Sequence, residues 1–374
     1  MKPPRQAAAL RDIRSLMRPH LVTAEPYEGV EPPEVLAQQA GIPEERLVKL
    51  NGNENPYGPS PKVAAALGRY RRYHLYPDPQ QRHLRQMLAE YAGTSPDRVV
   101  AGAGSDELID LLLRLFVGPG EGVIDCPPTF AMYATFIHLL GARLVLAPRD
   151  EAFGLDLRGI EEGARRGAKL VFVASPNNPT GNTTSEGTVR RLLELGLVVV
   201  VDEAYFEFTN QTVAPLVPHH ANLVVLRTFS KWAGLAGLRL GYGIMDPTVA
   251  ERLLAIKAPY NVNLAAEVAV EASLEDRDLL MSRVKAIVQA RDQLREELAR
   301  IPGVATFPST ANFLLCRMPH GKGRWVYQEL ARRGIFVRDF NTPLLQDCFR
   351  TSVGLPEENQ ALVKGLESIF EQGG

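Results

Sequence analysis

Short apolar runs alternate with longer amphipathic stretches through the middle of the chain. The runs are rich in Val, Leu and Ile and cover residues 98–101, 122–126, 143–147, 169–174, 197–201, 222–226 and 240–244. Continuous apolar runs of this length are typical of strands that are buried on both faces of a sheet. The helix-like stretches between them, such as 107–116, predict an α/β fold in which helices flank a mostly parallel sheet.

The pattern changes after residue 263. Residues 264–300 form one long, charged amphipathic stretch, which predicts one or two helices leading into a second domain. Shorter apolar runs at 304–307, 313–316 and 335–338 then predict the strands of a small α+β domain. We therefore divide the chain into residues 1–50 (an N-terminal arm and part of the small domain), 51–262 (the large domain) and 263–374 (the small C-terminal domain).

Two segments near the start differ from the rest of the chain. Residues 1–26 are polar and begin with several arginines, so we expect an arm or a solvated helix. Residues 51–61 are rich in Asn, Gly and Pro. Because proline removes a backbone donor and fixes the backbone, this second segment is predicted to be a loop.

Composition narrows the class of protein. The 374 residues carry 42 basic and 43 acidic side chains, and this balance gives no bulk attraction to nucleic acid or membrane. The start lacks a signal-type apolar core and no run of about 18 apolar residues occurs, so a cytoplasmic protein is expected. The three cysteines form no CxxC pair, and the histidines lack metal-ligand spacing. We expect small-molecule substrates and no metal site.

The stretch after the run 222–226 carries the strongest chemical signal. Ser230 and Lys231 come just after the expected strand end, where ligands bind in open α/β sheets. Thr228, Ser230 and Arg239 can hold a phosphate while Lys231 supplies an amine beside it. A pyridoxal phosphate enzyme needs this combination, because a lysine bonds covalently to the cofactor aldehyde. The alternative is a surface lysine in a Gly-rich turn.

Two other expected strands end in residues that suit the same cofactor. Asp202 follows the run 197–201 and can pair with a protonated pyridine nitrogen. Tyr205 can reach the phenolic oxygen of the ring, and Asn178 can donate to that same oxygen. Each has a structural alternative, namely a strand-ending carboxylate, a core tyrosine and a turn asparagine. Their order along the chain with Lys231 favours the cofactor.

A glycine-rich turn opens the first expected helix. Gly104 is followed by Ser105 and Asp106, and either of these two is a good helix cap. The free N–H groups of such a helix start form an anion site. A dinucleotide site is the rival interpretation, but Glu107 occupies the third glycine position of that fingerprint. A cofactor phosphate is the better ligand.

With these motifs in place, the chain resembles the fold-type I pyridoxal phosphate aminotransferases of class II, and within them most closely the histidinol-phosphate aminotransferases. The resemblance covers nearly the whole chain. The matching segments are residues 53–61, 76–79, 102–107, 126–130, 175–181, 202–205, 227–242 and 350–354. It implies pyridoxal 5'-phosphate as the cofactor of the large domain, and Lys231, Asp202 and Tyr205 as the catalytic residues.

The resemblance also implies cofactor contacts that the residues alone do not reveal. Phe130 matches an aromatic residue that stacks on the cofactor ring, where tyrosine is common. Tyr76 matches a tyrosine whose hydroxyl reaches the cofactor phosphate of the partner subunit. A homodimer with shared active sites is therefore expected.

Four residues are implied in substrate binding. Arg350 matches the arginine that takes the substrate carboxylate or its equivalent, and Arg338 is expected nearby as a second contact for an anionic group. Tyr27 matches a position near the substrate. Asn53 belongs to the loop that lines the substrate pocket. For each residue the alternative is structural, such as a salt-bridged surface arginine or a packing tyrosine.

The implied reaction transfers the amino group of L-histidinol phosphate to 2-oxoglutarate, giving imidazole acetol phosphate and L-glutamate in histidine biosynthesis. Trp232 and Phe130 depart from the family pattern, which has a small residue after the lysine and often a tyrosine for stacking. An aromatic amino acid aminotransferase and a threonine-phosphate decarboxylase therefore stay open as alternatives. A non-catalytic binding protein of this fold is the alternative from a different class.

Overall fold

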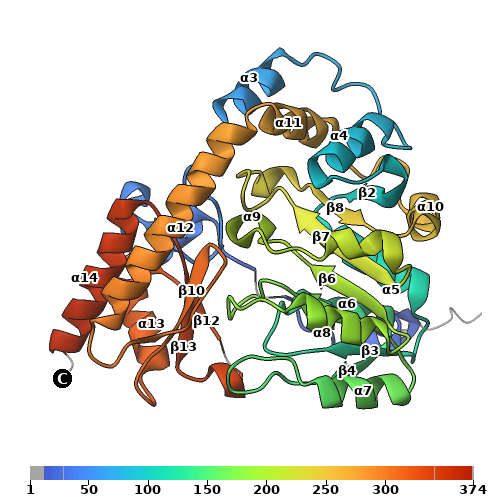
Figure 1. The fold of residues 1–374 in the computed structure, drawn as a ribbon. Helices are drawn as coiled ribbons and strands as arrows, with labels where there is room; N and C mark the ends of the chain where they lie inside the picture. The colour runs from blue at the N-terminus through green and yellow to red at the C-terminus, as the bar shows by residue number, and fades with distance from the viewer. Residues whose placement is uncertain (1–11, 28, 341, 373–374) are drawn as a thin grey trace, which may run out of the picture.

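A computed structural model describes residues 12–27, 29–340 and 342–372 of the chain. The first part of the expected arm, residues 1–11, lies outside the described residues. Two main sheets organise the fold, and one long helix runs beside both of them (Figure 1). Among the described residues, no helix is both long and apolar enough to cross a membrane.

The larger sheet has seven strands in the order β2-β8-β7-β6-β5-β3-β4. Their bounds are β2 (Val99–Gly102), β3 (Gly122–Asp125), β4 (Arg143–Leu146), β5 (Ala168–Ala174), β6 (Val198–Asp202), β7 (Leu223–Thr228) and β8 (Gly241–Ile244). All neighbours pair in parallel except β8, which is antiparallel to both β2 and β7. The predicted α/β fold with a mostly parallel sheet is confirmed, and each apolar run became a strand.

Helices cover both faces of this sheet. They are α3 (Pro61–Arg69), α4 (Arg82–Ala92), α5 (Ser105–Phe116), α6 (Met132–Leu140), α7 (Leu157–Arg165), α8 (Glu186–Leu193), α10 (Pro247–Ile256) and α11 (Leu264–Leu274). Short helices in the connections are η3 (Pro96–Arg98), α9 (Phe206–Thr209), η4 (Ala214–His219) and η5 (Ala236–Leu238). The inner strands are therefore shielded from water on both sides, as continuous apolar runs require. The edge strand β4 is not: its Leu144 and Leu146 are exposed.

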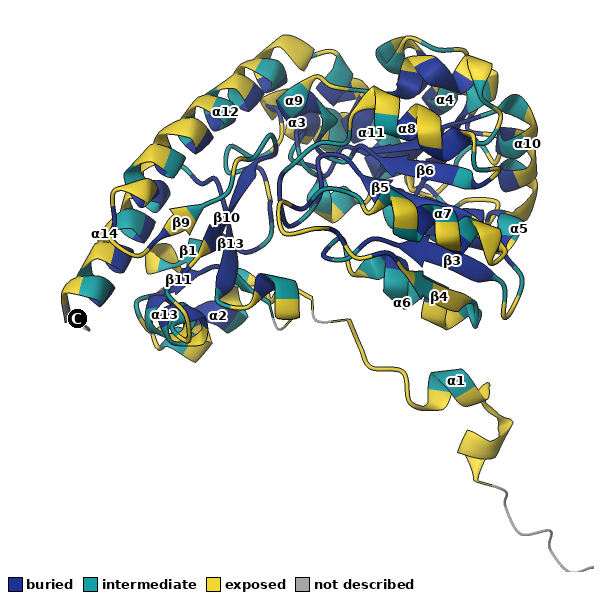
Figure 2. Cartoon of the chain, turned by 60° about the horizontal axis from the view of Figure 1, so that its bottom comes forward, coloured by how far each residue is buried: buried dark blue, intermediate teal, exposed yellow. Residues whose placement is uncertain are grey.

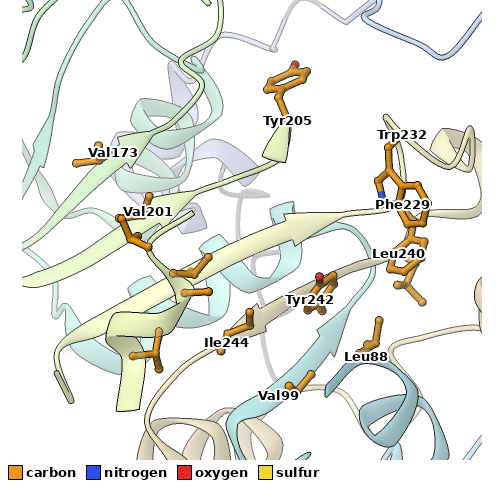
Figure 3. Close-up of a cluster of buried hydrophobic side chains, with 14 of the residues drawn as sticks. Leu88, Val99, Val173, Val201, Tyr205, Phe229, Trp232, Leu240, Tyr242 and Ile244 are labelled. Atoms are coloured by element: carbon orange, nitrogen blue, oxygen red, sulfur yellow. The ribbon is translucent and has the colours of Figure 1, made fainter. Parts of the chain in front are cut away.

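Alternate residues of each strand enter two different cores. Val199 and Val201 of β6 pack into a cluster with α4, α8 and α11, part of which Figure 3 shows. Val200 of the same strand packs into a second cluster with α5, α6 and α10. Because side chains alternate across a strand, Asp202 continues the face of Val200, and Glu203 continues the face of Val201.

The smaller sheet has four antiparallel strands in the order β12-β13-β10-β9. Its elements and covering helices are β9 (Ala305–Thr306), β10 (Phe313–Arg317), β12 (Arg338–Asp339), β13 (Cys348–Ser352), α12 (Arg277–Ala299), α13 (Gly323–Arg332), η6 (Pro343–Leu345) and α14 (Pro356–Gln372). A separate two-stranded pair joins β1 (Val48–Lys49) to β11 (Ile335–Phe336) in parallel. The segment before residue 50 thus contacts the C-terminal part of the chain.

The stretch 264–300 contains two helices, α11 and α12. Helix α11 packs against α3 and α4 and belongs to the core of the larger sheet. Helix α12 contributes Val284 and Ile287 to that same core, and Leu294 and Leu298 to the core of the smaller sheet. The domain division at residue 263 stays a prediction. We propose that the boundary lies inside α12, because the packing partners change there.

The N-terminal segment is mostly exposed over residues 12–27, whereas Leu36 and Ala37 in its later part are buried (Figure 2). It contains η1 (Ile13–Leu16), α1 (Pro19–Val22), α2 (Pro33–Ala40) and η2 (Glu44–Arg46). Helix α1 contacts α6, where a ring nitrogen of His20 lies 3.4 Å from the Leu139 carbonyl oxygen. The described part of the expected arm is thus an extended chain interrupted by single helical turns.

Candidate functional site

A pocket of about 180 Å³ lies where β5, β6 and β7 end, beside the first turn of α5. Parallel strands present their carboxyl ends at the same edge of a sheet, which explains why residues far apart in sequence meet there. The pocket is lined by the predicted residues Tyr27, Asn53, Ser105, Asp106, Phe130, Asn178, Asp202, Tyr205, Thr228, Ser230, Lys231, Arg239 and Arg350. Gly104, Tyr76 and Arg338 do not line it.

The start of α5 differs from the expectation. Gly104 is the N-cap, and Ser105 and Asp106 are the first two helical residues, so the prediction that one of them caps the helix was wrong. The turn needs a positive φ, which is +79° at Gly104, and a Cβ there would lie 2.5 Å from the Arg239 guanidinium. Glycine fits where serine or aspartate would not. The N–H groups of the first turn remain available to an anion.

Hydroxyl groups and a cation surround this helix start. Thr228 Oγ1 lies 2.9 Å from Ser230 Oγ, and it accepts the Ser230 N–H at 3.1 Å. Arg239 donates to Asp106 Oδ2 at 2.8 Å, and both side chains are partly exposed. An exposed pair of this kind contributes little stability. The arginine can therefore turn to an incoming phosphate at small cost, beside the helix dipole.

Lys231 follows the end of β7 by three residues and lines the pocket. Its Nζ donates to the Gly52 carbonyl oxygen at 3.3 Å. Burial, reinforced by the positive charge of Arg350, lowers the pKa of Lys231 to about 8. Far more of the amine is then neutral near physiological pH than in an ordinary lysine, and the neutral form is the one that attacks an aldehyde.

Asp202 is buried at the end of β6. Its Oδ2 accepts the Tyr133 hydroxyl at 2.7 Å, and its Oδ1 accepts the Ala204 N–H at 3.0 Å. Burial raises the pKa of Asp202 to about 6, and these two hydrogen bonds oppose the rise. The carboxylate is therefore ionised at neutral pH while it stays out of water.

Tyr133 was missed at the sequence level. It lines the pocket and lies one helical turn beyond Phe130, with the two rings edge to face at 5.5 Å. It is a fully buried residue of the apolar helix α6, so the sequence pattern around it is that of a core tyrosine. The available signal was its spacing from Phe130, since residues three apart meet on a helical turn.

Tyr205 and Asn53 both line the pocket and contact each other. Asn53 Nδ2 donates to the Tyr205 hydroxyl oxygen at 3.0 Å. Asn53 has a positive φ of 52°, and its N–H donates to Ser352 Oγ at 2.8 Å. The loop is thus tied to β13, and the buried phenol of Tyr205 is aimed at the pocket.

Arg350 lies on β13 of the smaller sheet, and its side chain lines the pocket. Its Nη1 donates to Asn178 Oδ1 at 2.6 Å, and its Nη2 donates to the Asn51 carbonyl oxygen at 2.7 Å. Its buried Nε has no hydrogen-bond partner among the described residues. Burial lowers the pKa of Arg350 to about 10, so it remains a cation at neutral pH. A buried cation with a spare donor is a suitable receptor for an anion.

Arg338 lies directly opposite Arg350 in the antiparallel pairing of β12 and β13. Side chains at such paired positions share one face of the sheet, so a second cation is close to the first. Arg338 lines a neighbouring cleft and donates to the Gly29 carbonyl oxygen at 3.3 Å. Tyr27 lies two residues before Gly29 in the N-terminal segment. Its side chain is 45% exposed and lines the pocket.

Tyr76 lies away from the pocket of its own chain. Its side chain is 79% exposed and stacks on Tyr260 with the ring centroids 4.3 Å apart. Trp232, which departs from the family pattern as Phe130 does, is fully buried and stacks on Tyr91. It therefore fills the core behind Lys231 and does not line the pocket.

The chain is similar over most of its length to one family of known proteins. A model of the family "Aminotransferase class I and II" matches residues 45–366. A histidinol-phosphate aminotransferase of Roseiflexus castenholzii is 51% identical over 96% of this chain and 99% of its own length. A chloroplastic histidinol-phosphate aminotransferase of Nicotiana tabacum is 42% identical over 95% of this chain and 87% of its own.

A solved structure extends the similarity to the fold. Histidinol-phosphate aminotransferase of Sinorhizobium meliloti, crystallised in complex with pyridoxal-5'-phosphate, superposes with a TM-score of 0.88 at 28% identity. The match covers 96% of this chain and 99% of that structure. The predicted fold and family resemblance are confirmed. The chain belongs to the aminotransferase class I and II family.

Proposed function

We propose that this chain is a pyridoxal phosphate-dependent aminotransferase that moves the amino group of L-histidinol phosphate to 2-oxoglutarate. The products are imidazole acetol phosphate and L-glutamate. The observation that carries the proposal is the convergence of Lys231, Asp202 and the α5 anion site in one pocket. The names of the full-length relatives support the substrate. The reaction belongs to histidine biosynthesis, in a protein that we expect to be cytoplasmic.

The residues of the pocket fit this cofactor. The amine of Lys231, with its lowered pKa, suits the aldehyde, and the buried carboxylate of Asp202 suits the ring nitrogen. Bound pyridoxal phosphate supplies an electron sink for the bond-breaking step. Its phosphate would be held by the first-turn N–H groups of α5, with Gly104 allowing the close approach of Arg239.

The remaining contacts complete the cofactor site. We assign Thr228 and Ser230 to the phosphate, Tyr205 and Asn178 to the phenolic oxygen, and Phe130 to stacking on the ring. The hydroxyl pair of Thr228 and Ser230 lies beside the start of α5. Asn178 is anchored by Arg350, which leaves its amide N–H groups to donate.

Lys231 has a second task in the proposed reaction. When it is not bonded to the cofactor, its free amine would hold and move the proton that leaves the substrate carbon. An amine with a pKa of about 8 can both accept and release a proton near neutral pH. Asp202 meanwhile stays ionised and holds a positive charge at the ring nitrogen.

Substrate binding is assigned to the wall formed by β13 and the N-terminal segment. Arg350 would bind the carboxylate of glutamate, and Arg338 on the same sheet face would serve as the second anion contact. Tyr27 and Asn53 line the same pocket as Arg350 and are assigned to the substrate with it. The same arginines then meet a phosphate in one half-reaction and a carboxylate in the other.

We further propose a homodimer with shared active sites. The exposed, stacked Tyr76 supports this, because a tyrosine held outside its own pocket is available to a partner subunit. A fully active monomer, measured by light scattering and activity at the same concentration, would contradict the assignment.

The substrate is tested by product analysis of the purified enzyme with pyridoxal phosphate and 2-oxoglutarate. With L-histidinol phosphate we expect equal amounts of glutamate and imidazole acetol phosphate. Equal rates with L-phenylalanine would identify a broad aromatic aminotransferase. Release of CO₂ from L-threonine phosphate would identify a decarboxylase. If pyridoxal phosphate does not bind at all, the chain is a binding protein of this fold.

A further inference from the structure

Tyr133, in the first turn of α6, is fixed from two sides. The side chain is fully buried, and its ring is parallel to that of Phe172 on β5, with centroids 4.7 Å apart and 4° between the planes. The ring of Phe130 meets its edge at 5.5 Å. Tyr133 therefore has little rotational freedom, and its hydroxyl position is set by packing rather than by the pocket.

The hydroxyl donates to Asp202 Oδ2 at 2.7 Å. A phenol that enters an apolar core needs a partner, and Tyr133 has taken the carboxylate that faces the pocket. The other oxygen of Asp202 accepts the Ala204 N–H at 3.0 Å. A carboxylate can accept about four hydrogen bonds, so capacity for a third donor in the pocket remains.

We propose that Tyr133 is a positioning residue of the reaction proposed above: its hydroxyl holds the Asp202 carboxylate in the orientation and ionised form that a protonated ring nitrogen requires. This inference rests on the proposed function. A donor to the charged form of a buried carboxyl favours that form, and two donors on different oxygens fix the plane of the group. Without Tyr133, Asp202 would more easily become neutral and lose its grip on the ring nitrogen.

A second buried tyrosine provides a matched control. Tyr91 donates to Glu207 Oε1 at 2.9 Å and stacks on Trp232 at 5.3 Å. The carboxylate of Glu207 is also buried, but it lies in the other core and does not line the pocket. Replacing Tyr91 with Phe removes the same kind of hydrogen bond without touching the cofactor site.

The test compares cofactor binding by the full-length wild type, Tyr133→Phe and Tyr91→Phe. Each is titrated with pyridoxal phosphate and with its 1-deaza analogue, in which a CH group replaces the ring nitrogen. Tyr133→Phe should weaken pyridoxal phosphate binding about ten-fold and leave the analogue unaffected, because only the nitrogen contacts Asp202. Tyr91→Phe should bind both cofactors as the wild type does. In steady state, Tyr133→Phe should lower kcat and leave the KM for histidinol phosphate nearly unchanged.

Two results would overturn the inference. One is unchanged binding of pyridoxal phosphate by Tyr133→Phe, and the other is an equal loss for both cofactors, which would indicate general damage. A double-mutant cycle with Asp202→Asn gives a second measurement: in that background Tyr133→Phe should have no further effect on binding, and an additive loss would contradict the coupling. Failure of the wild type to bind pyridoxal phosphate would instead reject the proposed function and this inference together.

Discussion

The ends of β6 and β7 carry buried polar or charged side chains on both faces of the sheet, and these side chains have different partners on the two faces. Asp202 and Thr228 face the pocket, whereas Glu203 and Arg227, their immediate neighbours in sequence, face the other core. On one face the charges are paired with each other. On the other they are held ready for a ligand.

On the face away from the pocket, which we call the closed face, the buried charges form an ion pair with each other. Arg227 donates from Nε to Glu203 Oε2 at 3.0 Å and from Nη2 to Thr212 Oγ1 at 2.7 Å. Val213 donates its N–H to the other oxygen of Glu203 at 2.7 Å. Although burial alone would lower it, the pKa of Arg227 is raised by Tyr242, Glu203 and Glu207. This pair fastens two strand ends together.

The pocket face, which we call the open face, is lined by titratable groups whose pKa values are shifted. Lys231 has a pKa lowered to about 8, Asp202 has one raised to about 6, and Arg350 keeps an unpaired Nε among the described residues. Perturbed groups that converge in a pocket are a mark of function, while a satisfied pair in the core serves structure. Sequence neighbours thus take opposite tasks because side chains alternate across a strand.

The largest expected effect is on the open face. Lys231→Ala should lose more than about 10⁴-fold in kcat, because both the covalent attachment and the proton transfer disappear. The visible absorption band of the lysine-bound cofactor should vanish, with the unfolding midpoint of the cofactor-free protein unchanged or higher. A variant that keeps the band would show that another lysine holds the cofactor.

On the closed face the loss should appear in stability. Glu203→Ala leaves the Arg227 charge buried without its partner, so the free energy of unfolding should fall by about 3–5 kcal/mol in urea titrations. The matched control is the double variant Glu203→Gln with Arg227→Met, which should recover much of that loss. Equal instability of the single and double variants would argue against the ion pair as the cause.

Arg350→Ala should mainly affect the glutamate half-reaction. Removing a buried cation that binds a carboxylate should raise the KM for glutamate about 100-fold. Arg338→Ala, on the neighbouring strand, should have a smaller effect, since it lies outside the pocket. An unchanged glutamate half-reaction in Arg350→Ala would move the carboxylate site elsewhere.

The lowered pKa of Lys231 predicts a stability change with pH. The unfolded chain binds this proton more tightly, because its lysine has the ordinary pKa of 10.5 against about 8 in the folded protein. Stability of the cofactor-free protein should therefore rise as pH increases from 8 to 10.5, relative to Lys231→Met. The expected gain is on the order of 2–3 kcal/mol. A flat difference would mean that the amine is not desolvated.

The strand positions and the strand-end residues of the pocket were predictable from the sequence for one physical reason, whereas Phe130 and Arg350 were expected only from the family resemblance. Buried parallel strands are continuous apolar runs, and their carboxyl ends meet at one edge, so Asp202 and Lys231 could be brought together before the fold was known. The direction of β8 could not be predicted, since an apolar run looks the same in either direction.

Other features needed the three-dimensional packing. Gly104 became the helix cap because Arg239, far along the chain, occupies the space where a side chain would be. Tyr133 lies in an apolar pattern typical of the core, and only the folded structure shows the hydrogen bond from its hydroxyl to Asp202. Helix α12 serves two cores, which an amphipathic pattern does not show.

The most direct measurement is a single-turnover absorbance trace of the pyridoxal phosphate-loaded enzyme mixed with L-histidinol phosphate in the absence of 2-oxoglutarate. The account predicts rapid loss of the yellow band as the amino group passes to the cofactor, with L-phenylalanine and L-threonine phosphate far slower. Addition of 2-oxoglutarate should restore the band. A band that persists with histidinol phosphate would contradict the account.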